Sequence, residues 1–95
     1  MADLQQRFEH GQLVATPGAL ELLRELEISS SYLLERHLSG DWGDVPKEDA
    51  KENEFSLKYG FRVVSSYNVG DNGQRIWIIT ESDRASTCLL LPEEY

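Results

Sequence analysis

Charged and apolar residues follow a helical spacing over the first two thirds of the chain. Thr16-Pro17 introduces apolar positions that recur every three or four residues, and Thr as N-cap with Pro at the first helical position is a typical helix start. A second amphipathic stretch covers residues 32–39 after a run of serines, and Gly40 ends it. A third covers roughly residues 47–59, with Gly60 as its stop. We therefore expect three helices, and in the third we expect the inward side chains to be Ala50, Phe55 and Leu57.

After Gly60 the period of the pattern changes from helical spacing to two. Residues 61–69 alternate between two faces, which is typical of a strand. Asn72-Gly73 is a strong hairpin signal and leads into a second strand at 74–80, which is rich in Ile and Trp. A further turn precedes an apolar strand at 86–91. The pattern predicts a three-stranded antiparallel meander, and the segment 8–15 could contribute a fourth short strand.

Helices followed by strands indicate an α+β fold in which N-terminal helices pack on an antiparallel meander. We expect one domain over residues 1–95, with 1–10 frayed, 16–59 mainly helical and 61–92 forming the meander. Amphipathic helices that cover one face of such a sheet leave the other face wet or available to a partner.

Charge is unevenly distributed along the chain. The 95 residues include 9 Lys and Arg against 17 Asp and Glu, for a formal net charge of -8. The acidic residues are densest between Asp41 and Glu54. Because nucleic-acid affinity comes largely from basic side chains that displace counterions, extended DNA wrapping is disfavoured. A local phosphate site stays possible, since Arg62, Arg75 and Arg84 lie in the half of the chain without excess negative charge.

Several classes of protein are disfavoured by simple absences in the sequence. Cys88 is the single cysteine, so an internal disulfide is impossible and a thiolate zinc site is disfavoured. The spacing of His10 and His37 matches no metal motif, and no phosphate-binding glycine loop is present, so we expect no metal and no cofactor. His37, near the end of a predicted helix, is interpreted as a favourable partner of the helix dipole. No apolar run is long enough to cross a membrane and no secretory signal is seen, so the expected location is cytoplasmic, with no membrane partner.

Five segments of the chain carry a resemblance to known proteins: residues 11–20, 36–44, 53–54, 76–84 and 89–95. They resemble a family of small bacterial proteins of plasmids, integrative elements and similar variable genome regions. The resemblance covers nearly everything from Gly11 onward and implies a bacterial, mobile-element origin. It implies no reaction, because no activity is established for the family.

The order of helices and then a meander is also similar to small bacterial ribonucleases and toxins of the barnase and RelE type. A ribonuclease needs a base, an acid and a cation for the transition state. Arg62, Arg84 and Tyr67 are the candidates for these roles. The alternative interpretation is structural, because Arg62 and Arg75 would then be cross-strand neighbours in solvent and Arg84 would serve a turn. We favour the structural interpretation, since the spacing fixes no catalytic geometry.

Trp77 lies in a strand that carries bulky apolar residues on both faces. Either the sheet is covered twice, with Trp77 in the core, or Trp77 and Ile79 form a patch for a partner, together with Tyr67 or Arg75. An acidic second contact region follows from the segment 41–54, where Trp42 is expected to anchor a tight loop; its members are Trp42, Asp41, Asp44, Glu48 and Asp49. The leading hypothesis is a non-enzymatic interaction or regulatory module that binds another protein. The alternatives are the ribonuclease, with RNA as its substrate, and an acidic decoy for nucleic-acid-binding proteins.

Overall fold

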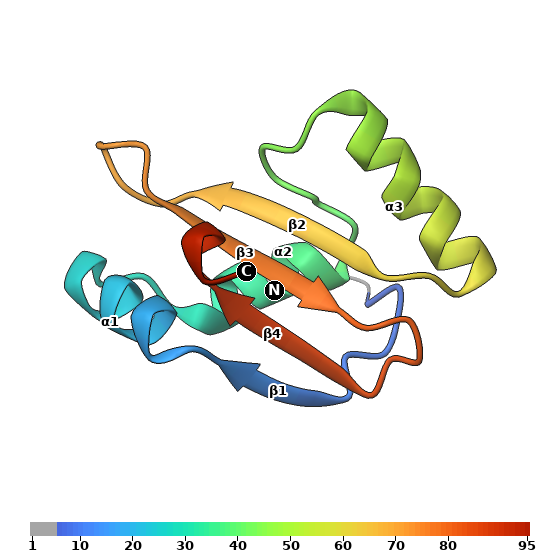
Figure 1. Ribbon diagram of the computed structural model, residues 1–95, viewed down its shortest axis with the longest axis horizontal. Helices are drawn as coiled ribbons and strands as arrows, with labels where there is room; N and C mark the ends of the chain where they lie inside the picture. Colours follow the sequence, from blue (N-terminus) through green and yellow to red (C-terminus); the bar gives the residue numbers. More distant parts are fainter. Residues whose placement is uncertain (1–5) are drawn as a thin grey trace.

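The computed structural model describes residues 6–95, which form three helices and a four-stranded sheet (Figure 1). In chain order the elements are β1 (Gln12–Ala15), α1 (Pro17–Leu26), α2 (Ser30–Leu38), α3 (Lys47–Tyr59), β2 (Val63–Asn68), β3 (Arg75–Thr80), β4 (Ser86–Leu90) and a final 3₁₀ turn, η1 (Pro92–Glu94). The strands are arranged in the order β1-β4-β3-β2. In Figure 1, α2 lies behind the sheet, α1 lies to its left, and α3 runs beside β2. The α+β class predicted from the sequence is confirmed.

The prediction of a purely antiparallel sheet is wrong, because the sheet is mixed. Strands β2, β3 and β4 form the expected antiparallel meander, but β1 pairs with β4 in parallel, with Leu13 opposite Thr87. The fourth strand that the segment 8–15 could contribute is present as β1, so the first element of the chain is a strand and not a helix. Gly11 makes the approach of β1 possible: its φ is +63°, and a Cβ there would lie 2.3 Å from the carbonyl carbon of Ala85. Of the segment 1–10, which was expected to be frayed, residues 1–5 lie outside the described residues. Arg7 is attached to the body of the protein, because its amide donates to the carbonyl of Leu38 at 2.8 Å and its guanidinium pairs with the carboxylate of Glu54 at 2.8 Å.

The helix starts and stops follow the local signals in the sequence. The Thr16 hydroxyl accepts a hydrogen bond of 3.1 Å from the amide of Ala19, and Pro17 takes the first helical position. The bounds of α3 agree with the predicted 47–59, and Gly60 ends it at φ +79°. Helix α2 starts at Ser30, two residues before the predicted range.

The predicted inward face of α3 is wrong. Phe55 is half exposed, and Ala50 and Leu57 are only partly buried, while the buried residues of the helix are Asn53 and Ser56. The physical reason is that α3 packs beside the edge strand β2. The outward N–H and C=O groups of that strand need hydrogen-bonding side chains rather than apolar ones.

The core lies between the sheet and helices α1 and α2. The alternation expected over 61–69 is confirmed within β2, where Val63, Ser65 and Tyr67 are all fully buried, whereas Phe61 precedes the strand and is exposed. The main cluster consists of Ala19, Leu23, Leu33, Tyr67, Ile76, Ile78 and Leu89. On the opposite, outer face of the sheet, Ile79 and Leu90 are also buried, so part of that face is covered as well. Within residues 6–95, no helix has the length and apolar character that crossing a membrane requires.

Candidate functional site

Helix α3 is held at the edge of the sheet by one amide side chain. Asn53 donates from Nδ2 to the carbonyl of Val64 at 2.8 Å and accepts from the amide of Val64 at 3.0 Å. These are the two backbone groups that an added strand would bond, so Asn53 takes the place of a neighbouring strand. The contact fixes the helix beside β2 without requiring an apolar helix face.

The loop before α3 occupies the rest of the same edge. The amide of Asp44 donates to the carbonyl of Ser66 at 2.6 Å, and the amide of Ser66 donates to the carbonyl of Trp42 at 3.1 Å. Farther along, the Asp44 carboxylate accepts from the amide of Asn68 at 2.8 Å. The free edge of β2 is thereby blocked along its length, and the loop is fixed in the position from which α3 starts.

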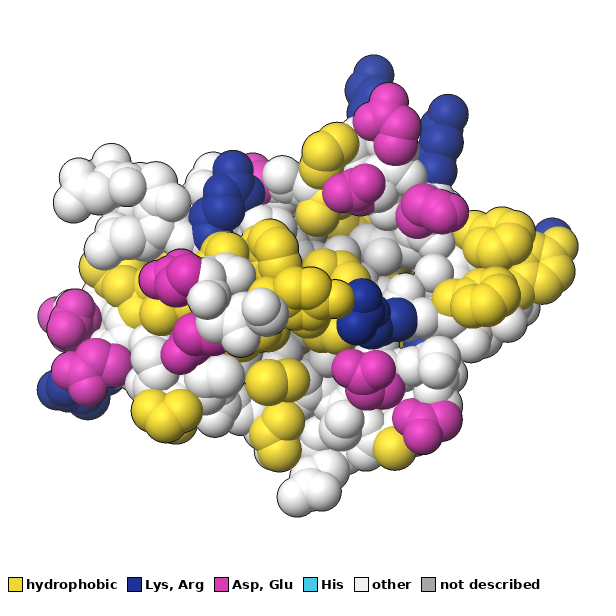
Figure 2. Space-filling view, in the orientation of Figure 1, with side chains coloured by type: hydrophobic (Ala, Val, Ile, Leu, Met, Phe, Trp, Pro, Cys, Tyr) yellow, Lys and Arg dark blue, Asp and Glu magenta, His cyan; other side chains and the backbone are white. Residues whose placement is uncertain are grey.

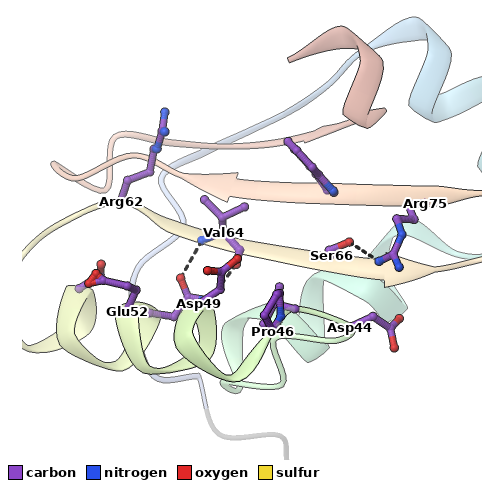
Figure 3. Close-up of a pocket in the computed structure, with 12 residues that line it drawn as sticks. Asp44, Pro46, Asp49, Glu52, Arg62, Val64, Ser66 and Arg75 are labelled. Carbon is purple, nitrogen blue, oxygen red and sulfur yellow. Dashed lines mark hydrogen bonds between the residues drawn. The ribbon is translucent and has the colours of Figure 1, made fainter.

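A groove of about 610 Å³ separates α3 from the outer face of β2 and β3. Figure 3 shows Asp49 and Glu52 projecting from the helix on one side and Val64 and Ser66 on the sheet across from them. Its charged lining consists of Asp44, Asp49, Glu52, Arg62 and Arg75, and its larger apolar residues are Val45, Pro46, Val64 and Trp77. The acidic segment and the Trp77 strand, two separate regions in the sequence, thus face each other across one groove.

The charges of the groove are not neutralised by ion pairs. Among residues 6–95, none of the three groove carboxylates pairs with a basic side chain. Arg75 donates to the hydroxyl of Ser66 at 2.9 Å, and Arg62 donates to the hydroxyl of Tyr95. Figure 3 places the two arginines at opposite ends of the groove. Arg75 pairs with Asn68, which lies six positions after Arg62, so the backbones of the two arginines are roughly 20 Å apart. The expectation that Arg62 and Arg75 are cross-strand neighbours is therefore wrong.

Trp77 is half-buried on the outer face of the sheet, where its ring meets that of Tyr95 at a centroid distance of 5.6 Å. The choice between core and interface is therefore resolved in part: the ring is packed on one side and lines the groove on another. Ile79, expected beside it in an exposed patch, is only 5% exposed. Of the residues predicted for this surface, the groove contains Trp77 and Arg75.

Tyr67 does not belong to the predicted surface. Its side chain is fully buried on the helix-covered face, and its hydroxyl donates to the carbonyl of Asp41 at 2.6 Å. Burial raises the pKa of Tyr67 above its ordinary value. Tyr67 pairs with Ile76 in the register, so it lies one residue out of step with Trp77, which pairs with Ser66.

The predicted acidic contact region is divided by the structure. Asp44 and Asp49 line the groove, whereas Glu48 is exposed outside it. Asp41 is bound to Arg36 at 2.6 Å, and this hydrogen bond holds the pKa of the Asp41 carboxyl below its usual value. Trp42 is 6% exposed and anchors the loop, as expected, so its ring offers little surface to a partner.

The three candidates for ribonuclease chemistry, Arg62, Arg84 and Tyr67, lie in different parts of the structure. The guanidinium of Arg84 donates to the carbonyls of Phe61, Glu81 and Ser56 at 2.7, 2.9 and 3.2 Å. It therefore ties the ends of three elements together, in line with its interpretation as a turn residue. Arg62 faces the groove and Tyr67 lies in the core, so the three do not share a site.

His37 lies at the centre of a buried hydrogen-bonded cluster. Its Nδ1 is 2.6 Å from the hydroxyl of Ser65, its Nε2 is 2.9 Å from that of Thr80, and the Thr80 hydroxyl is 2.7 Å from that of Thr87. The Thr87 hydroxyl donates to the carbonyl of His10 at 2.8 Å, so Thr87 accepts from Thr80 and Thr80 accepts from His37. This order assigns the proton of the neutral ring to Nε2.

The interpretation of His37 as a charged partner of the helix dipole is wrong. Burial, with a contribution from the positive charge of Arg84, lowers the pKa of His37 to about 3. The ring is therefore neutral near neutral pH, and both it and Ser65 are fully buried, out of reach of a substrate. His10 is on the surface, where its ring bonds the carbonyl of Gly11.

The described part of the chain, residues 6–95, shows neither a metal centre nor a reactive thiol. Within residues 6–95 there is no group of three or more His, Cys, Asp or Glu side chains that could hold a metal ion. Burial raises the pKa of the Cys88 thiol, with smaller contributions from the carboxylates of Glu94 and Glu81. A thiol with a raised pKa is a weak nucleophile at neutral pH.

Sequence reasoning missed an aromatic patch formed by Phe55, Tyr59 and Phe61 at the C-terminal end of α3. All three are at least half exposed. Phe55 lies 4.6 Å from Tyr59 and 5.8 Å from Phe61 between ring centroids. Figure 2 shows hydrophobic side chains gathered at the end of the molecule where α3 finishes. Phe55 and Tyr59 are four positions apart, so they lie on one side of the helix, nearly opposite Asn53. This spacing was the sequence signal that could have indicated the patch.

Comparison with known proteins adds no relative: no family model, no curated protein and no solved structure matches the chain. The resemblance to plasmid-related bacterial proteins therefore stays a prediction. Function has to be argued from the groove itself.

Proposed function

We propose that the protein is a non-enzymatic binding module that holds an extended, basic segment of a partner protein in the groove between α3 and the sheet. The observation that carries the proposal is the convergence of Trp77 with three carboxylates that have no ion-pair partner among residues 6–95. Following the sequence resemblance, we place this partner in a plasmid or similar mobile element, where the module acts as an accessory or regulatory protein.

The charge of the groove favours a basic segment. Asp49 and Glu52 project from α3, and Asp44 lies at the end where the helix begins (Figure 3). Lys or Arg side chains of a bound segment would pair with these carboxylates. The formal net charge of -8 adds a long-range attraction for a basic partner, and this attraction weakens as salt screens it.

The arginines of the groove suit the backbone of such a segment. A guanidinium donates hydrogen bonds and accepts none, so Arg62 and Arg75 can bind the carbonyl groups of an extended peptide. Since Arg62 and Asn68, the partner of Arg75, are six positions apart, the groove accommodates about six residues of extended chain.

The apolar part of the groove supplies an anchor. Trp77, Val64 and Pro46 line its wall and floor, and Trp77 is open to the groove on one side. Aromatic residues at the centre of an interface often carry much of the binding energy. We therefore expect the partner segment to place one large apolar side chain on Trp77.

A library of short peptides displayed on phage and selected on the purified protein tests the proposal. We expect the enriched peptides to combine Lys or Arg with one large apolar residue, and their affinity to fall as salt is raised. Trp77→Ala and the double change Asp49→Asn with Glu52→Gln should each weaken binding by roughly tenfold or more. The matched control changes Glu21→Gln and Glu25→Gln, which remove two exposed carboxylates from α1 and should leave binding unchanged.

Three results would contradict the proposal: no enrichment of basic peptides, equal binding by the groove variants and the control, or loss of binding with Phe55→Ser but not with Trp77→Ala. The last result would transfer the binding site to the aromatic patch. Circular dichroism of each variant shows that a loss of binding is not a loss of fold.

A further inference from the structure

The two edges of the sheet differ in whether their outward backbone groups have hydrogen-bonding partners. Backbone groups of Val64, Ser66 and Asn68 on the β2 edge are bonded by Asn53 and by the loop before α3. At the opposite edge, the amides of Gln12 and Thr16 donate to the carbonyls of Ala85 and Leu89 at 2.9 and 3.0 Å. In a parallel ladder the residues between them, Leu13 and Ala15, direct their N–H and C=O groups away from β4. Among residues 6–95, no chain segment lies beyond β1 to bond those groups.

The exposed edge strand is short but lacks the other devices that usually prevent strand pairing. Native proteins protect an edge by keeping its strand very short or with charged residues, proline or a covering loop. Strand β1 has four residues, and within residues 6–95 it has no charged residue, no proline and no covering loop. Residues 11–20 carry no charged side chain and form the longest such run in the chain. Leu13 and Val14 are 46% and 42% exposed, one on each face of β1. Beside the strand, a shallow apolar groove of about 220 Å³ includes Leu20 and Leu34 in its lining and has no charged side chain.

We propose that the β1 edge is a self-association site, where a second copy of this chain adds its own β1 in antiparallel orientation. A two-fold axis at Val14 would place Leu13 of one copy opposite Ala15 of the other, so that both pairs exchange backbone hydrogen bonds. On one face of the sheet the two Val14 side chains meet, and on the other face each Leu13 packs beside an alanine. The two four-stranded sheets then form one continuous sheet. Figure 1 shows β1 at the edge of the sheet in one copy.

The absence of charge at this edge suits a second copy better than a basic partner. Each copy carries a net charge of -8, so two copies repel each other, and this repulsion is weakest where they meet at an uncharged surface. The strip formed by residues 11–20 and the apolar groove beside it has no charged side chain. A basic partner would find no carboxylate there. This proposal does not depend on the peptide groove, and the two have opposite salt dependence: screening should strengthen association of two acidic copies and weaken binding of a basic peptide.

Sedimentation velocity from micromolar to millimolar protein tests the association, and amide hydrogen exchange tests the surface used. We expect a monomer–dimer equilibrium that shifts toward dimer with added salt. In the dimer the exchange rates of the Leu13 and Ala15 amides should fall to about one tenth of their monomer values or below. The amide of Val14 is already bonded to β4, so its exchange rate should change little. A monomer at every concentration, or a dimer in which the Leu13 and Ala15 amides exchange as before, would overturn the proposal.

Val14→Lys supplies the direct variant, because it places two like charges at the two-fold axis without altering the backbone bonds to β4. We expect it to be monomeric. Phe55→Lys is the matched control, since it replaces an apolar residue of similar exposure on α3, and it should still dimerise. If Val14→Lys fails to fold, Leu13→Pro removes one outward N–H and should have the same effect. A dimer that persists in the β1 variants, or that is lost in Phe55→Lys, would refute the assignment. The assignment would also be refuted if the β1 edge bound a strand of another protein while this protein alone stayed monomeric.

Discussion

Acidification should destabilise this protein in a pH range where its net charge alone predicts the opposite. Lowering the pH from about 7 to about 5 reduces negative charge, which relieves repulsion in a chain of net charge -8. His37 acts in the other direction. Its pKa is lowered from 6.5 to about 3 by burial and by the charge of Arg84. Between these two pH values the unfolded chain therefore binds a proton at His37 that the folded chain does not bind.

The magnitude follows from the width of that interval. The unfolded state binds more protons between pH 6.5 and about 3, so the free energy of unfolding falls by about 1.4 kcal/mol for each pH unit of acidification below 6.5. The whole interval corresponds to about 5 kcal/mol, and the part above about pH 5 to about 2 kcal/mol. The pKa values of Asp41 and Glu54 are lowered too, but their contributions are lost only at more acidic pH, below their unfolded values of 3.8 and 4.5.

Urea unfolding at several pH values above about 5, followed by tryptophan fluorescence, measures this loss. Trp42 is a suitable probe because its ring lies 6.0 Å from that of His37 between centroids. His37→Gln removes the titrating group and should flatten the pH dependence, although it also lowers stability at neutral pH. His10→Gln is the control, since the partly exposed His10 ring lies outside the buried cluster, and this variant should retain the full slope.

The reasoning would be refuted by a stability that rises on acidification to about pH 5, or by a slope that persists in His37→Gln. Nuclear magnetic resonance gives a second and independent readout. The ring protons of His37 in the folded protein should show no titration between pH 7 and about 5, and a midpoint near 6.5 would contradict the proposed neutral cluster.

Two further predictions concern the β2 edge. Asn53→Ala leaves both backbone groups of Val64 without their partner and should lower the free energy of unfolding by about 1–3 kcal/mol in urea titrations, whereas an unchanged value would mean that water replaces the amide without loss. Gly43→Ala should cost at least about 2 kcal/mol more than Gly73→Ala in the same assay. Both glycines have positive φ, at +76° and +74°, but a Cβ on Gly43 would lie 2.1 Å from the carbonyl oxygen of Ser66, whereas one on Gly73 would meet nothing within 4 Å. Equal losses for the two variants would show that backbone strain alone matters.

The parts of the fold that could be predicted are those encoded by neighbouring residues. Thr16-Pro17 specifies a helix start, Gly60 a helix stop and Asn72-Gly73 a hairpin, and each signal acts through local backbone geometry. The pairing of β1 with β4 has no such signal. It joins residues more than seventy positions apart in the sequence and depends on where three helices and a meander finally lie.

The candidate site shows the same division. Trp77 and the acidic segment were recognisable as unusual from composition and periodicity, but that they line one groove follows from the position of α3. Tyr67 was misplaced because alternation shows which residues of one strand share a face without giving the register between strands. Only the pairing of Ser66 with Trp77 determines that Tyr67 lies on the other face.

The groove is a consequence of how this short chain covers its sheet. Helices α1 and α2 both pack on one face, where Ala19, Leu23 and Leu33 join the core, so α3 and the turn η1 are what remains for the other face. Because α3 is attached through Asn53 to the backbone of an edge strand, and not through an apolar stripe, it stands beside the sheet and leaves Trp77 partly uncovered. The polar residues that block one edge against strand addition therefore also build the wall of the peptide groove. At the other edge no such residues are present, which is why we assign the two edges different partners: a basic segment beside β2 and a second copy beside β1.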